Sequence, residues 1–123
     1  MNAIIYTYSD MEYESIKTII ENQDMAIEVS RAPLEGHKSY YDEYDIVIVG
    51  LKGAEGMEVV LEYSQRYKNS RLIWISDDEH FAGTALRAHI YDFIVRPYEK
   101  DVISKSILEA IKTSPSRHQW NFG

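Results

Sequence analysis

The sequence contains no cysteine, which excludes disulfide bonds and thiolate chemistry. No apolar run approaches the roughly 20 residues that a membrane-spanning helix needs, and the first residues lack the basic and apolar regions of a signal peptide. Glycine and proline number only 6 and 3, and no glycine-rich phosphate-binding loop or nucleophile elbow occurs. We therefore expect a cytoplasmic protein that contacts no membrane.

Negative charge predominates, with 20 acidic against 13 basic side chains and a net charge of −7. This balance disfavours direct binding to nucleic acid or to anionic membranes, because both are themselves negatively charged. The four histidines follow neither the HExxH pattern nor the spacing of a zinc site. They are His37, His80, His89 and His118. We expect no metal, no cofactor and no nucleic-acid partner.

Strand-like and helix-like segments alternate along the 123 residues, which is typical of βαβ units around a parallel sheet. The β-branched runs predict strands at 3–8, 26–30, 44–49, 71–76 and 91–95. Helical periodicity and helix-start signals predict helices after Ser9, from Pro33, at 56–67, at 80–88 and from Asp101. We expect an α/β fold, a three-layer doubly wound sandwich of five strands and five helices.

Residues 1–112 have the length and pattern of one domain, and residues 113–123 form a C-terminal tail without periodicity. Two aromatic residues, Trp120 and Phe122, are unusual in such a tail. They either pack onto the domain or anchor a partner protein.

Three predicted strands end in residues of chemical interest, namely Gly50, Ser76 and the pair Arg96-Pro97. In an open parallel sheet, the carboxyl ends of the strands border one crevice, where binding or chemistry is normally found. We expect these positions to be neighbours in that crevice.

The strand before Gly50, the segment Trp74-Ile75-Ser76 and the segment 91–97 together resemble the receiver (CheY-like) domain of bacterial response regulators. The stretch from Asp77 to Pro97 is most similar to receivers of LytTR-type regulators. The resemblance implies a flavodoxin-like sheet with strand order 2-1-3-4-5. It also implies that Gly50 stands where receivers carry the aspartate that accepts a phosphoryl group, and that Arg96 replaces their lysine.

Receiver chemistry also uses a pair of acidic residues after the first strand to hold Mg²⁺. The resemblance puts this pair at Tyr8 and Ser9, whose hydroxyls are poor replacements for carboxylate ligands. Asp10 follows and lies at the same edge, where a first-turn acid also stabilises the helix. We expect no tight Mg²⁺ site, no phosphorylation and no enzymatic activity.

The candidate residues also have structural interpretations. Gly50 is expected either at a close backbone approach or at a disabled acceptor site. Ser76 either caps the next helix or directs its hydroxyl at an anion, and Arg96 pairs with Asp77 or Glu55 or holds an anion. Phe93 matches the aromatic residue that switches in receivers, and we expect it to be fixed in the core.

The sequence thus favours a non-phosphorylatable receiver-like module in a two-component or related pathway. Its expected partner is another protein, either a kinase, an effector or a second copy in a homodimer. The expected binding face consists of the fourth helix, the fifth strand and the fifth helix. Two alternatives remain open: a working receiver that uses Asp10 as a displaced acceptor, and a flavodoxin-like domain that binds a small molecule or nucleotide in the crevice.

Overall fold

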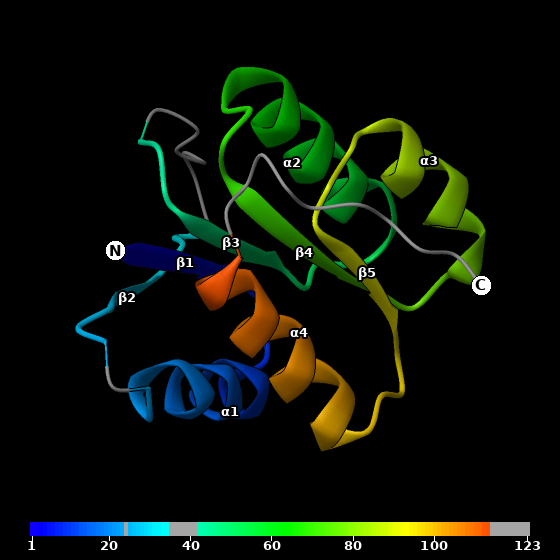
Figure 1. The fold of residues 1–123 in the computed structure, drawn as a ribbon. Coiled ribbons are helices and arrows are strands. Elements are labelled where there is room, and N and C mark those ends of the chain that lie inside the picture. Colours follow the sequence, from blue (N-terminus) through cyan, green and yellow to red (C-terminus); the bar gives the residue numbers. More distant parts are fainter. Residues whose placement is uncertain (24, 35–41, 114–123) are drawn as a thin grey trace.

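The computed structural model describes residues 1–23, 25–34 and 42–113, and Figure 1 shows their arrangement. A five-stranded sheet is flanked by α-helices on both faces. The elements in chain order are β1 (Asn2–Tyr6), α1 (Asp10–Glu21), β2 (Glu28–Arg31), β3 (Ile46–Val49), α2 (Gly53–Arg66), β4 (Arg71–Ser76), the 3₁₀-helix η1 (Glu79–Phe81), α3 (Ala82–Arg87), β5 (Asp92–Val95) and α4 (Lys100–Lys112).

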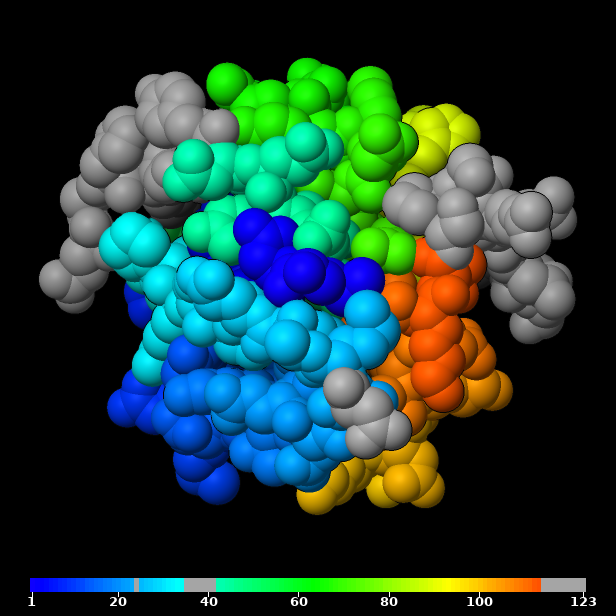
Figure 2. Space-filling model, turned by 60° about the vertical axis from the view of Figure 1, so that its left-hand side comes forward, coloured from blue at the N-terminus to red at the C-terminus, as the bar shows by residue number. Residues whose placement is uncertain are grey.

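The strand order is β2-β1-β3-β4-β5 and every neighbouring pair is parallel, which confirms the predicted topology. Helices α1 and α4 cover one face of the sheet, and α2 and α3 cover the other (Figure 1). Figure 2 shows the β2 edge of the sheet at the surface, between α1 on one side and the α2 layer on the other. All strands therefore end at one edge, as the crevice interpretation requires.

Successive side chains along each strand point to opposite faces of the sheet, and this divides the core into two halves. In β3, Ile46 and Ile48 pack toward α1 and α4, whereas Val47 and Val49 pack toward α2. All four side chains are completely buried. This pattern explains why the central strand reads as a continuous β-branched run: in a parallel sheet covered on both faces, each side of the strand meets a helix.

Helix α2 lies close to the end of β3 because Gly56 has no side chain. A Cβ atom there would lie 2.3 Å from the backbone oxygen of Leu51 and 3.2 Å from Nε1 of Trp74. Trp74 is itself completely buried, stacked on Phe81 and edge-on to Phe93. Gly56 thus determines how near the helix comes to the crevice.

Several predicted boundaries are corrected by the structure. The first strand ends at Tyr6, because the following residues engage in side-chain contacts around the helix start. The second strand is shifted to Glu28–Arg31 by its register with β1. The helix expected at 80–88 is divided into η1 and α3, because the side chain of Asp78 caps a 3₁₀ turn.

Two further expectations concern segments that the structure describes only in part. Pro33 begins no helix, and the rest of the second helix expected there lies in 35–41, outside the described residues. Trp120 and Phe122 also lie outside the described residues. Among the helices that the structure describes, none has the length and apolar character required to cross a bilayer.

Candidate functional site

A cavity of about 470 Å³ opens at the carboxyl edge of the sheet. It lies between the β1–α1 loop, the end of β3, the start of α2 and the end of β5. The structure thus brings the predicted crevice positions Tyr8, Ser9, Gly50 and Arg96 together. Four more residues line the cavity that were not predicted as site residues. The lining residues are Thr7, Tyr8, Ser9, Glu12, Gly50, Lys52, Glu55 and Arg96.

The start of α1 directs Glu12 into this cavity. Ser9 is the N-cap, and its Oγ accepts a hydrogen bond from the backbone N–H of Glu12 at 3.1 Å. The spacing from Ser9 to Glu12 matches a capping box and predicts that the Glu12 side chain reaches back to the Ser9 backbone N–H. This is wrong: the Ser9 N–H donates to Oγ1 of Thr7 at 3.2 Å, which leaves the Glu12 carboxylate for other donors.

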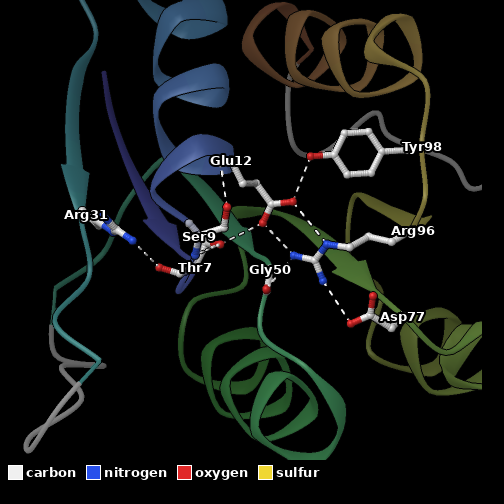
Figure 3. A network of polar contacts seen from close by, with 8 residues as sticks. All are labelled: Thr7, Ser9, Glu12, Arg31, Gly50, Asp77, Arg96 and Tyr98. Atoms are coloured by element: carbon white, nitrogen blue, oxygen red, sulfur yellow. Dashed lines mark hydrogen bonds and ion pairs between the residues drawn. The ribbon is translucent and has the colours of Figure 1, made fainter.

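Glu12 forms a bidentate ion pair with Arg96 (Figure 3). The Arg96 Nη2 and Nε donate to its Oε1 and Oε2 at 2.6 and 3.2 Å. The hydroxyl of Thr7 donates to Oε1 at 2.8 Å, and the phenol of Tyr98 donates to Oε2 at 2.9 Å. Only 9% of the Glu12 side chain is exposed, so the pair is largely shielded from water.

Arg96 has two further acceptors. Its Nη2 donates to the backbone oxygen of Gly50 at 2.7 Å, and its Nη1 lies 3.4 Å from the Asp77 carboxylate. The Asp77 contact was expected from the sequence, but Glu12 is the nearer and better aligned partner. Glu55, the other acid considered, instead accepts from the phenol of Tyr8 at 2.9 Å. The Arg96-Pro97 peptide bond is cis.

Gly50 is required by the space that these side chains occupy. It is buried, and its N–H donates to the backbone oxygen of Tyr6 at 2.7 Å. A Cβ atom at this position would lie 2.7 Å from Oε1 of Glu12 and 2.9 Å from Nη2 of Arg96. The Glu12–Arg96 ion pair therefore fills the volume into which a side chain at residue 50 would project.

The charges of this cluster stabilise one another. Burial is the largest influence on the Glu12 carboxyl and raises its pKa, but the hydrogen bonds from Arg96 and Thr7 outweigh burial and bring the pKa below its ordinary value. Burial lowers the pKa of Arg96, and the contacts with Glu12 more than reverse this. Burial and the bond to Glu12 raise the pKa of Tyr98 to about 12. At neutral pH the site therefore holds an anion, a cation and a neutral phenol.

Three other predicted residues have mainly structural contacts. The Ser76 hydroxyl accepts from the backbone N–H of Asp78 at 3.0 Å, whereas Asp78 itself caps η1, so Ser76 is not the helix cap. Asp10 accepts from Arg31 at 2.6 Å, and its side chain is 88% exposed. Phe93 is half-buried against Trp74, with the ring centroids 5.3 Å apart.

The residues at this edge do not fit a Mg²⁺ ion. Mg²⁺ requires free carboxylate oxygens in a strict octahedral arrangement. The Glu12 carboxylate is saturated by four hydrogen bonds, and that of Glu55 accepts from Tyr8. Within the described residues, no three histidine or acidic side chains lie together in a way that could hold a metal ion.

Glu12, Thr7 and Tyr98 were not predicted as site residues. Glu12 was interpreted only as part of a cap, although it lies within one turn of the carboxyl edge of β1. Tyr98 follows the Arg96-Pro97 pair directly, and this position next to a predicted site residue could have indicated that it belongs to the site. The ion pair itself joins residues 84 positions apart, and no local pattern reports such a contact.

No protein-family model and no curated protein matches the chain by sequence. Solved structures do match its fold. The response regulatory domain of protein mrkE from Klebsiella pneumoniae is 16% identical, with 91% of this chain and 96% of that chain covered and a TM-score of 0.70. A signal receiver domain from Clostridium thermocellum is 21% identical, with 91% and 98% covered and a TM-score of 0.70.

An orphan response regulator of H. pylori is 14% identical, with 90% of this chain and 96% of that chain covered and a TM-score of 0.69. The present chain has the receiver fold. At such identities the likeness concerns the receiver fold alone, so the chemistry of this receiver-like crevice has to be argued from its own residues.

Proposed function

We propose that this chain is a signalling module of receiver type that carries no phosphoryl group and acts by binding another protein. The observation that carries the proposal is the occupation of the space next to Gly50 by the Glu12–Arg96 ion pair. In receivers, this place belongs to the aspartate that accepts the phosphoryl group. Here the position has no nucleophile, and its cation is already neutralised.

Phosphoryl transfer also depends on positive charge that stabilises the transferred group. Arg96 is committed to Glu12 and to the backbone of Gly50, and the cavity contains a second carboxylate, Glu55. An incoming phosphate would meet the carboxylates of Glu12 and Glu55, with Lys52 as the second cation of the cavity wall and without a Mg²⁺ ion to offset their charge. The receiver fold therefore serves here as a scaffold for recognition, and we propose that it does so in a two-component or related pathway.

The proposed contact surface is the face formed by α3, β5 and α4. It presents two large exposed apolar side chains, Leu86 on α3 and Val102 on α4, which are 46% and 48% exposed. The two side chains belong to helices that pack on opposite faces of the sheet, on either side of the edge strand β5. The proposed partner is a kinase, an effector or a second copy of the chain.

Among the alternatives, the cavity of about 470 Å³ favours a small-molecule site over a displaced acceptor. Asp10 is engaged by Arg31, and it does not line the cavity. A nucleotide or other anionic ligand, however, would have to compete with Glu12 for Arg96. The protein-binding proposal involves no such competition.

The proposal is tested by incubating the protein with acetyl phosphate and Mg²⁺ and recording its intact mass. We expect no gain of a phosphoryl group in the wild type or in Asp10→Ala, while an ordinary receiver in the same buffer is labelled. A labile phosphoryl adduct on the wild type would overturn the proposal. Its loss in Asp10→Ala would then identify the displaced acceptor.

A further inference from the structure

We propose that the Glu12 carboxylate is a permanent internal ligand of the crevice. It occupies the site of a small carboxylate or other oxyanion on Arg96, and its removal opens that site to such anions from solution. Glu12 would thus regulate access of anions to the crevice. Only the signalling role of the crevice rests on the proposed function.

Both oxygens of the Glu12 carboxylate are fully engaged by hydrogen-bond donors. Arg96 offers two parallel N–H donors to the two carboxylate oxygens, the geometry by which arginine recognises free carboxylates. Thr7 and Tyr98 add one hydroxyl donor to each oxygen. Four donors from three residues on two separate segments thus surround one carboxylate, as they would surround a bound ligand (Figure 3).

These donors belong to two segments that the parallel sheet brings to the same edge. Thr7 follows β1, while Arg96 and Tyr98 follow β5 and precede α4. The Arg96 guanidinium also binds the backbone oxygen of Gly50 at the end of β3. The anion therefore links the start of α1 to the β5–α4 loop across the edge of the sheet.

Removal of the Glu12 carboxylate would leave Arg96 without its nearest counter-ion. Arg96 is only 20% exposed, and its remaining carboxylate, Asp77, lies 3.4 Å away and is itself 43% exposed. A largely buried guanidinium left with one long contact to a partly exposed carboxylate and with the Gly50 backbone oxygen is poorly compensated, which favours capture of another anion. The adjoining cavity gives a solute access to the vacated volume.

The crevice of the native protein is thus occupied from within. An external oxyanion can reach Arg96 only by displacing Glu12, which is held in place at high effective concentration because it belongs to the same chain. The β5–α4 loop is consequently held in one position by contacts within the chain, without any bound ligand.

The test compares Glu12→Ala with the wild type by hydrogen exchange of the segment 96–102, in sodium chloride and in sodium acetate of equal ionic strength. In chloride, we expect exchange in the variant to be roughly tenfold faster or more, because charge-assisted bonds to the loop are lost. Acetate should restore the wild-type rate with a saturable dependence on concentration, and inorganic phosphate serves as a second probe. Neither anion should affect the wild type.

The matched control is Asp10→Ala, which removes a carboxylate from the same turn of α1. Asp10 contacts Arg31 and not the β5–α4 loop, so neither exchange at 96–102 nor its anion dependence should change. Unaltered exchange in Glu12→Ala, or an acetate response no larger than that of Asp10→Ala, would overturn the inference.

If Glu12→Ala is unfolded in both salts, Glu12→Gln decides the question. Its amide fills the same space, so we expect fast exchange at 96–102 without any response to acetate. Wild-type exchange in this variant would contradict the inference. Phosphoryl labelling of the wild type would contradict the proposed function instead, so the two failures are distinguishable.

Discussion

Oxygen Oε1 of Glu12 lies 2.7 Å from the point that a Cβ atom on Gly50 would occupy. A side chain at position 50 and the Glu12 carboxylate therefore cannot occupy this volume together. The carboxylate from α1 can enter the crevice only because the residue after β3 has no side chain. The absence of an acceptor side chain at position 50 and the presence of the Glu12 carboxylate in the crevice therefore depend on each other.

Substitution of Gly50 tests this relationship directly. We expect Gly50→Ala to lower the free energy of unfolding by about 1–2 kcal/mol, because the ends of Glu12 and Arg96 must move. Gly50→Asp should cost more, since it places a second carboxylate beside Glu12. Urea denaturation measures both effects, and mass spectrometry with acetyl phosphate and Mg²⁺ should show no robust labelling of Gly50→Asp.

The double variant Gly50→Asp/Glu12→Ala provides the control for that prediction. With Glu12 removed, the new aspartate has room and can pair with Arg96, so the double variant should be more stable than the sum of the single effects predicts. Strict additivity, or Mg²⁺-dependent labelling of Gly50→Asp alone, would show that the steric and electrostatic account of this site is wrong.

The pH dependence of stability should report the depressed pKa of Glu12. A carboxyl whose pKa is lower in the folded than in the unfolded protein adds stability above its unfolded pKa, and that contribution is lost as the pH falls through the folded value. The stability advantage of the wild type over Glu12→Gln should therefore be constant near neutral pH and shrink below about pH 4.3. Denaturation across this range measures it, and an advantage that grows on acidification would contradict the assignment.

Replacing Arg96 by lysine restores the residue type that the resemblance implies, yet we expect it to be harmful here. Lysine is a point charge and cannot bind both oxygens of Glu12 and the Gly50 backbone together. A loss of about 1–3 kcal/mol is expected by thermal or urea denaturation. The control is Arg31→Lys, whose ion-pair partner Asp10 is 88% exposed and which should cost less than about 1 kcal/mol.

Gly56 and Gly83 should respond to alanine in opposite ways. A Cβ atom on Gly56 would lie 2.3 Å from the Leu51 backbone oxygen, which cannot yield without moving the end of β3. We expect Gly56→Ala to destabilise by about 3 kcal/mol or more. Gly83 lies exposed in α3 with only the end of Arg87 nearby, so Gly83→Ala should be neutral or stabilising by about 0.5–1 kcal/mol. Equal effects would contradict the close approach of α2.

The proposed contact face can be mapped by charge insertion. Leu86→Glu and Val102→Glu place a carboxylate among the exposed apolar side chains of α3 and α4 and should abolish partner binding or self-association. Met11→Glu is the control, because Met11 is 85% exposed on α1. Sedimentation velocity detects a dimer, and quantitative co-purification detects another partner. Equal binding by all three variants would exclude this face.

The architecture could be predicted from the sequence because its signals are local. The continuous β-branched run at 46–49 can be satisfied only by a strand covered on both faces, and β3 is that strand. Element boundaries were less accurate at 80–88, where the Asp78 cap of η1 competes with a continuous helix. No periodic pattern distinguishes these two outcomes.

The candidate site was predicted only in part. Gly50 and Arg96 could be placed at one edge because parallel strands end together. The role of Glu12 could not, because a carboxylate three residues after Ser9 satisfies the capping-box pattern equally well. The Glu12 carboxylate can bind either the Ser9 backbone N–H or Arg96. It binds Arg96, because two charged N–H donors of a guanidinium are a stronger partner than a single backbone N–H.

The Glu12–Arg96 contact spans 84 positions of the chain. During synthesis, β1, α1, β2 and β3 emerge long before the residue that neutralises Glu12. Until Arg96 is translated, the amino-terminal half cannot form the Glu12–Arg96 ion pair. Ordering of the crevice is thereby tied to completion of the whole polypeptide.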